Sequence, residues 1–139
     1  MESRKIPIIK LRDNLLVSIQ VELDDQLALT LQDDITHEIV KTGAMGLILD
    51  VSAINIMDSY IARVINNIGR NARIMGARPV VVGLQPAIAI TLVEMGMEME
   101  SVDTALNLEA GLELMEDAGE DWDEEEDEEG EPFRDGDEQ

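Results

Sequence analysis

The sequence contains no cysteine and only three aromatic residues, Tyr60, Trp122 and Phe133. Without cysteine the chain has no disulfide framework, no thiol nucleophile and no thiolate metal site. The scarcity of aromatic rings argues against a stacking platform for bases or sugars. The hydrophobic core therefore has to be built from isoleucine, leucine, valine, methionine and alanine.

Basic residues are also scarce, because ten lysines and arginines face 31 aspartates and glutamates, for a formal net charge of −21. From Asp117 onward there are 14 acidic residues and one basic residue, Arg134, so this tail carries −13 and the preceding residues −8. With no basic patch to neutralise phosphates, this distribution argues against binding to nucleic acid. It argues equally against adsorption to anionic membranes.

Long apolar runs are absent. The first residues, MESRKIPIIKLRDN, lack the apolar stretch of a signal peptide, and no run approaches the roughly 20 residues needed to span a bilayer. We therefore expect a cytoplasmic protein.

The length of 139 residues predicts a single folded domain, residues 1–116, followed by an acidic tail, residues 117–139. The tail is a run of like charge with little to bury, which predicts disorder. Its expected role is solubility, and the alternative is an acidic lure for a basic partner surface.

The pattern of apolar residues predicts strands and helices in the order ββαβαβαβα. Two short β-rich runs separated by Arg12, Asp13 and Asn14 predict a hairpin, and Pro7 favours an edge position for its first strand. Later strands alternate with helices, which implies parallel pairing through right-handed crossovers. The expected strands are 6–11, 15–21, 46–50, 79–82 and 97–102, and the expected helices are 25–41, 59–76, 86–94 and 106–115. The predicted fold class is α/β, with a mixed, mostly parallel sheet, an antiparallel N-terminal hairpin and about four flanking helices.

The stretch from Asp50 to Ser59 joins a buried strand to an amphipathic helix. Asp58 is a favourable N-cap, because its carboxylate can accept a hydrogen bond from the unpaired N–H groups of the first helical turn. Ser59 is then the first helical residue, on the surface and near the positive end of the helix dipole. That position suits either a regulated phosphate or an ordinary surface serine.

Catalytic and metal-binding patterns are weak. His37 is the only histidine and has no candidate nucleophile beside it, so the sequence predicts no enzyme. The acidic tail lacks the ligand spacing and central glycine of an EF-hand loop, so we expect no metal site or cofactor.

The order of elements, with strand LILDVS, loop AINIMDS and helix YIARVI, resembles the STAS domain of anti-anti-sigma factors. The family's loop reads D-x-S-x-x-x-x-x-D-S, and Asp50, Ser52, Asp58 and Ser59 occupy that pattern here. The resemblance implies that Ser59 is the phosphoacceptor. The chain has Tyr60-Ile61 where common anti-anti-sigma factors have a small residue and a glycine. The run DSYIARVI and the segments after it resemble instead the small RsbS-type scaffolds of the bacterial stressosome.

The resemblance implies a noncatalytic scaffold that forms homo-oligomers and co-assembles with RsbR-type STAS sensor paralogues. Such a scaffold sequesters an RsbT-type serine kinase, releases it when Ser59 is phosphorylated, and is reset by an RsbX-type phosphatase. Asp58, Tyr60 and Arg63 would flank the phosphosite and contribute to partner docking. Two alternatives remain: an anti-anti-sigma factor that binds an anti-sigma kinase, and a module that binds a small ligand or nucleotide in a crevice at the strand ends.

Overall fold

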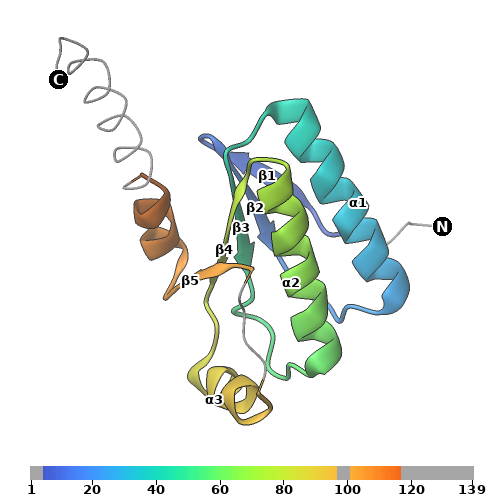
Figure 1. Ribbon diagram of the computed structural model, residues 1–139, viewed down its shortest axis with the longest axis vertical. Helices are drawn as coiled ribbons and strands as arrows, with labels where there is room; N and C mark the ends of the chain where they lie inside the picture. Colours follow the sequence, from blue (N-terminus) through green and yellow to red (C-terminus); the bar gives the residue numbers. More distant parts are fainter. Residues whose placement is uncertain (1–4, 97–100, 117–139) are drawn as a thin grey trace, which may run out of the picture.

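The computed structural model describes residues 5–96 and 101–116. The predicted disordered tail, residues 117–139, lies outside these ranges. Strands and helices alternate in the predicted order, as Figure 1 shows. The elements are β1 (Ile8–Leu11), β2 (Asn14–Ser18), α1 (Asp25–Thr42), β3 (Gly46–Asp50), α2 (Ser59–Ile74), β4 (Arg78–Val82), α3 (Pro86–Glu94) and β5 (Asp103–Ala105). Residues 108–116 form a further helical segment, called here the C-terminal helical segment.

The five strands form one sheet in the order β1-β2-β3-β4-β5. β1 and β2 are antiparallel, and each later pair is parallel. The predicted α/β fold, with an antiparallel hairpin at the edge of a mostly parallel sheet, is confirmed. The turn is shorter than predicted, because Asn14 belongs to β2 and pairs with Leu11, which leaves Arg12 and Asp13 as the loop.

Both faces of the sheet are covered, which explains why β3 is an unbroken apolar run. Leu47 and Leu49 point into the main core, together with the inner faces of α1 and α2. Ile48 points to the other face, where it packs with Val80 and Val82 beneath the C-terminal helical segment. In Figure 1 that segment lies across the sheet from α1 and α2. The alternation follows from the two-residue period of a strand.

Local capping sets the start of the two long helices. The Asp24 carboxylate accepts a hydrogen bond from the Leu27 N–H at 2.8 Å, and Asp58 makes the same contact with the Ile61 N–H at 2.9 Å. Gly43 ends α1 with a φ of 69°, a left-handed conformation that glycine adopts without strain. The cap at Asp58 agrees with the prediction.

The bounds predicted for the last strand, residues 97–102, differ from those observed. Residues 97–100 lie outside the described part of the chain, Ser101 and Val102 form a turn and a bend, and the strand is Asp103–Ala105. Val102 is buried against α2, where a Cβ on Gly69 would meet its Cγ1 at 2.4 Å. The apolar Val102 therefore serves helix packing, and the short run after it pairs with β4.

Candidate functional site

Ser59 lies at the N-terminus of α2, at the end of the sheet where the parallel strands finish. Its side chain is exposed, and it forms no hydrogen bond within residues 5–96 and 101–116. The neighbouring Asp58 is held by its capping bond to Ile61 and by its own carbonyl, which accepts from the Ala62 N–H at 3.1 Å. A rigid backbone thus presents a free hydroxyl.

The loop that leads to Ser59 is anchored at both ends. Val51 and Met57 are buried, whereas Ile56 between them is 81% exposed. At the start of the loop the Ser52 N–H donates to the Asp50 carboxylate at 2.9 Å, and the Ile54 N–H donates to the Val51 carbonyl at 3.0 Å. Asp50 and Ser52 therefore shape the loop and do not touch Ser59 through any hydrogen bond in the described residues.

A second loop, after β4, supports the first. The Gln85 amide donates to the Ser52 carbonyl at 3.0 Å and to the Asn55 side-chain oxygen at 3.2 Å. Gly83 has a φ of +79°, and a Cβ there would lie 2.8 Å from the Ser52 Cβ. Glycine is thus required at position 83 both by its backbone conformation and by the close approach of the two loops.

Tyr60 connects the N-termini of the two long helices. Its side chain packs partly against the core, and its hydroxyl hydrogen-bonds to Asp25, the first residue of α1. That hydrogen bond, with desolvation and the negative charges of Asp25, Asp24 and Asp58, raises the pKa of Tyr60 above 10.0. Three carboxylates therefore surround the residue next to Ser59.

A crevice of about 470 Å³ lies beside Asp58 and Tyr60. Its walls come from the segment after β2 and from the loop before α2, and most of them are aliphatic. The charged residues that line it are Glu22 and Asp58, and no lysine, arginine or histidine does so among the described residues. The crevice suits an apolar group better than a phosphate.

The structure brings together some of the predicted site residues and not others. Asp58, Ser59 and Tyr60 form one surface at the start of α2, and exposed Arg63 lies four residues after Ser59, on the same side of the helix. Asp50 and Ser52 belong to the adjoining loop. In the part of the chain that the structure describes, no group of three or more His, Cys, Asp and Glu side chains could hold a metal ion.

Sequence reasoning missed Asp25, Gly83 and Gln85 as parts of the site. Asp25 acts across two helices, and Gln85 and Gly83 act across two loops, so neither contact has a local signature. One general signal was available, because the loops that follow adjacent parallel strands meet at the same edge of a sheet.

None of the described helices is both long and apolar enough to cross a membrane.

A comparison with known protein families agrees with the fold and with the loop that leads to Ser59. The model of the STAS domain matches residues 5–111. The chain therefore belongs to the STAS domain family, and the resemblance inferred from the sequence is confirmed.

Within the family the chain is similar to stressosome proteins. A solved structure of RsbS from Moorella thermoacetica, which carries a serine-to-glutamate substitution, is 34% identical, with a TM-score of 0.73, and the alignment covers 84% of this chain and 99% of that one. A chain of a structure described as the molecular architecture of the stressosome, "a signal integration and transduction hub", is 37% identical, with a TM-score of 0.72 and coverage of 81% and 98%.

A curated relative is longer. The RsbT co-antagonist protein RsbRA of Bacillus subtilis (strain 168) is 24% identical over 113 residues, which are 81% of this chain and 41% of the relative. A second co-antagonist from the same organism, RsbRD, is 25% identical over 76% of this chain and 38% of its own length. The chain thus spans about two fifths of the length of these relatives.

Proposed function

We propose that this protein is a noncatalytic, cytoplasmic scaffold of a stressosome. In this proposal it forms homo-oligomers, co-assembles with RsbR-type STAS paralogues and sequesters an RsbT-type serine kinase. Phosphorylation of Ser59 releases the kinase, and an RsbX-type phosphatase restores the first state.

Sequence identity supports the scaffold assignment. The chain is 34% identical to the RsbS chain, and 24% and 25% identical to the two RsbT co-antagonists.

The observation that carries the phosphorylation proposal is the exposed Ser59 hydroxyl at the first position of α2. Asp58 already uses the Ile61 N–H, so the N–H groups of Ser59 and Tyr60 are left without an intrahelical acceptor. A phosphate on Ser59 can accept hydrogen bonds from such groups and is stabilised by the helix dipole. Modification of Ser59 therefore leaves the fold intact.

The release step follows from charge. A phosphoserine adds about −1.5 to −2 charges at pH 7. This negative charge would be added to a surface that is already acidic, because Asp58 precedes Ser59 and the carboxylates of Asp24 and Asp25 lie near Tyr60. Arg63, four residues along α2, is the cation placed to pair with it. Repulsion and the diversion of Arg63 together loosen a partner docked over Asp58, Tyr60 and Arg63.

The experiment is an incubation of the purified chain with its cognate kinase and ATP, followed by mapping of the product by mass spectrometry. We expect one phosphate, on Ser59, and none in Ser59→Ala. Ser52→Ala is the matched control, because Ser52 is an exposed serine of the adjoining loop. Labelling that persists in Ser59→Ala, or that disappears in Ser52→Ala alone, would contradict the assignment.

The rival assignment as an anti-anti-sigma factor predicts a different partner. A pull-down from the source cells that recovers a kinase bound to a sigma factor favours the rival. Recovery of larger STAS paralogues favours the scaffold.

The crevice beside Asp58 is the observation that favours a ligand-binding module. Because no cation lines it within the described residues, a nucleotide phosphate would find no partner there. Calorimetry with ATP and GTP is expected to give no binding heat. Micromolar binding would replace the scaffold proposal with a nucleotide-sensing one.

A further inference from the structure

A second cleft lies at the end of the sheet opposite to Ser59. Its volume is about 570 Å³, and it opens over the first residues of the parallel strands, where Asn14, Gly46 and Arg78 are register neighbours. A strand of five residues is about 16 Å long, so the cleft is separate from the Ser59 surface. We call it the arginine cleft.

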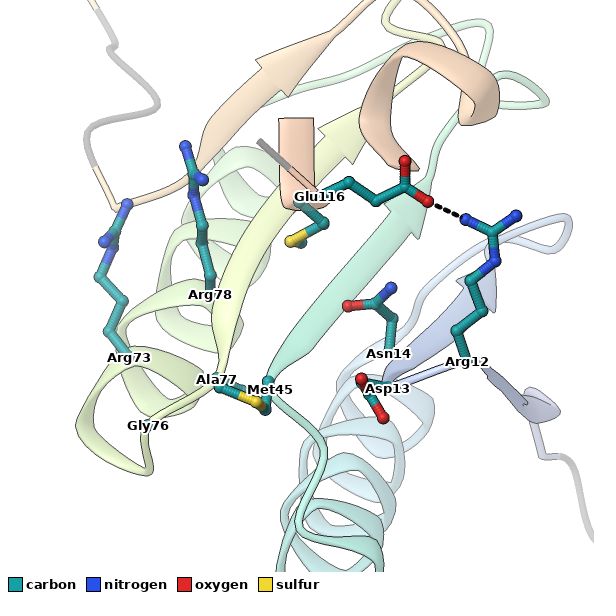
Figure 2. A pocket seen from close by; sticks show the side chains of 10 residues that line it. Arg12, Asp13, Asn14, Met45, Arg73, Gly76, Ala77, Arg78 and Glu116 are labelled. Atoms are coloured by element: carbon teal, nitrogen blue, oxygen red, sulfur yellow. Dashed lines mark hydrogen bonds and ion pairs between the residues drawn. The ribbon is translucent and has the colours of Figure 1, made fainter. Parts of the chain in front are cut away.

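Three of the ten basic residues of the chain line this cleft. Figure 2 shows Arg73 and Arg78 on one side and Arg12 on the other, with Met45 and Asn14 between them. The carboxylates of Asp13 and Glu116 also line the cleft, so three guanidinium groups face two carboxylates here, on a molecule that is otherwise strongly acidic.

The carboxylates already present do not use all the donors of these arginines. Arg12 pairs with Glu116, and one carboxylate, Asp103, serves both Arg78, at 2.9 Å, and Arg73, at 3.8 Å. Each guanidinium has five N–H donors, so further carboxylates can bind without displacing the first ones.

A buried amide also lines the arginine cleft. Asn14 is only 7% exposed, and its side chain forms no hydrogen bond with any residue of the described ranges. Its oxygen lies so close to Gly46 that a Cβ there would be 2.2 Å away. Buried polar groups are almost always hydrogen-bonded, so this amide points to an occupant of the cleft.

The chain supplies an occupant of matching charge. Glu116, the last described residue, already lies at the rim and binds Arg12. The 23 residues that follow hold 14 acidic side chains and one basic one. They start beside the cleft, so their effective concentration there is of millimolar order, which compensates for weak individual ion pairs.

We propose that the acidic segment 117–139 of the same chain binds in the arginine cleft. Carboxylates that follow Glu116 take the free donors of Arg12, Arg73 and Arg78, and the Asn14 amide faces the bound segment. The proposal is independent of Ser59 and of the kinase, because it concerns the other end of the sheet.

The absence of cysteine and the single tryptophan, Trp122, allow a direct test in the full-length chain. A cysteine replacing Ile74, which is 78% exposed beside Arg73, is labelled with an acceptor of tryptophan emission. Trp122 is six residues from Glu116, a reach of at most about 20 Å. A label at Leu29→Cys, an exposed position near the start of α1, is the distant control.

We expect stronger energy transfer from Trp122 to the label at position 74 than to the label at position 29. The transfer to position 74 is expected to fall in Arg12→Gln/Arg73→Gln, and to stay unchanged in Lys5→Gln/Arg63→Gln, which removes the same charge elsewhere. It is also expected to fall between 0.1 and 1 M salt, where the screening length shrinks from about 10 to about 3 Å.

Equal transfer to both labels, no effect of salt, or no effect of the arginine variant would each overturn the proposal. A loss of transfer on dilution would also overturn it, because it would assign the bound segment to a second copy. Thermal unfolding by circular dichroism verifies that the variants fold, and the salt series tests the wild-type sequence itself.

Discussion

At the scale of single residues, Tyr60 gives a measurable property of the Ser59 surface. Its raised pKa means that folding favours the neutral phenol. The corresponding stability is present below the unfolded value of 10.0 and is lost as the pH rises through the higher folded value. Denaturant unfolding at a series of alkaline pH values is expected to show this loss in the wild type and a weaker one in Tyr60→Phe.

The same residue reports on charge at position 59. Tyr60 is the only tyrosine, so phenolate absorbance titrates it alone. Because Ser59 precedes Tyr60 directly, we expect Ser59→Glu to raise its pKa further, and Ser59→Gln, a neutral control of similar size, to leave it nearly unchanged. A midpoint at or below 10.0 in the wild type would contradict the contact with Asp25.

Single residues also show which contacts could be predicted from the sequence and which could not. The caps Asp24 and Asp58 were predictable, because a cap bonds to a residue only three positions away. The bond from Tyr60 to Asp25 and the bonds of Gln85 to the Ser52 loop join residues about 30 or more positions apart, and no local pattern specifies them.

At the scale of elements, α2 carries a glycine whose replacement tests packing against propensity. Alanine is favoured over glycine inside a helix by about 1 kcal/mol. A Cβ on Gly69 would, however, lie 2.4 Å from Val102 and 2.9 Å from the Ser101 carbonyl. Overpacking of this kind costs about 1–3 kcal/mol, so we expect Gly69→Ala to lower the free energy of unfolding.

Urea unfolding measures the effect of Gly69→Ala. Arg70→Ala, at the next and exposed position of α2, is the control and is expected to change stability by no more than about 0.5 kcal/mol. A Gly69→Ala protein more stable than the wild type would show that residues 101–102 yield to the helix.

The elements were largely predictable because their periodicity is local. The last strand shows the limit of such prediction. Val102 is apolar because it packs against α2, and the strand after it, Asp103–Ala105, has a mixed composition. Its parallel pairing with β4 forms this strand, although its own residues show no strand pattern.

At the scale of the whole molecule, the scaffold proposal predicts assembly. Light scattering of the chain alone, and of the chain mixed with an RsbR-type STAS paralogue, is expected to show a larger particle for the mixture. Ser59→Glu is expected to keep that particle, because the substitution changes one exposed residue and no core contact. A mixture that scatters as the sum of its parts would contradict co-assembly.

Arg12, finally, has a backbone conformation that is unfavourable for a residue with a side chain. It opens a two-residue hairpin turn with a φ of +58°, the left-handed conformation that costs a side-chain-bearing residue about 1–2 kcal/mol and glycine almost nothing. The turn is therefore less stable than it could be, while its guanidinium forms one rim of the arginine cleft. We expect Arg12→Gly to raise the thermal stability of the chain and, at the same time, to remove the positive charge from one rim of the arginine cleft. At this position folding stability and charge recognition are therefore in direct competition.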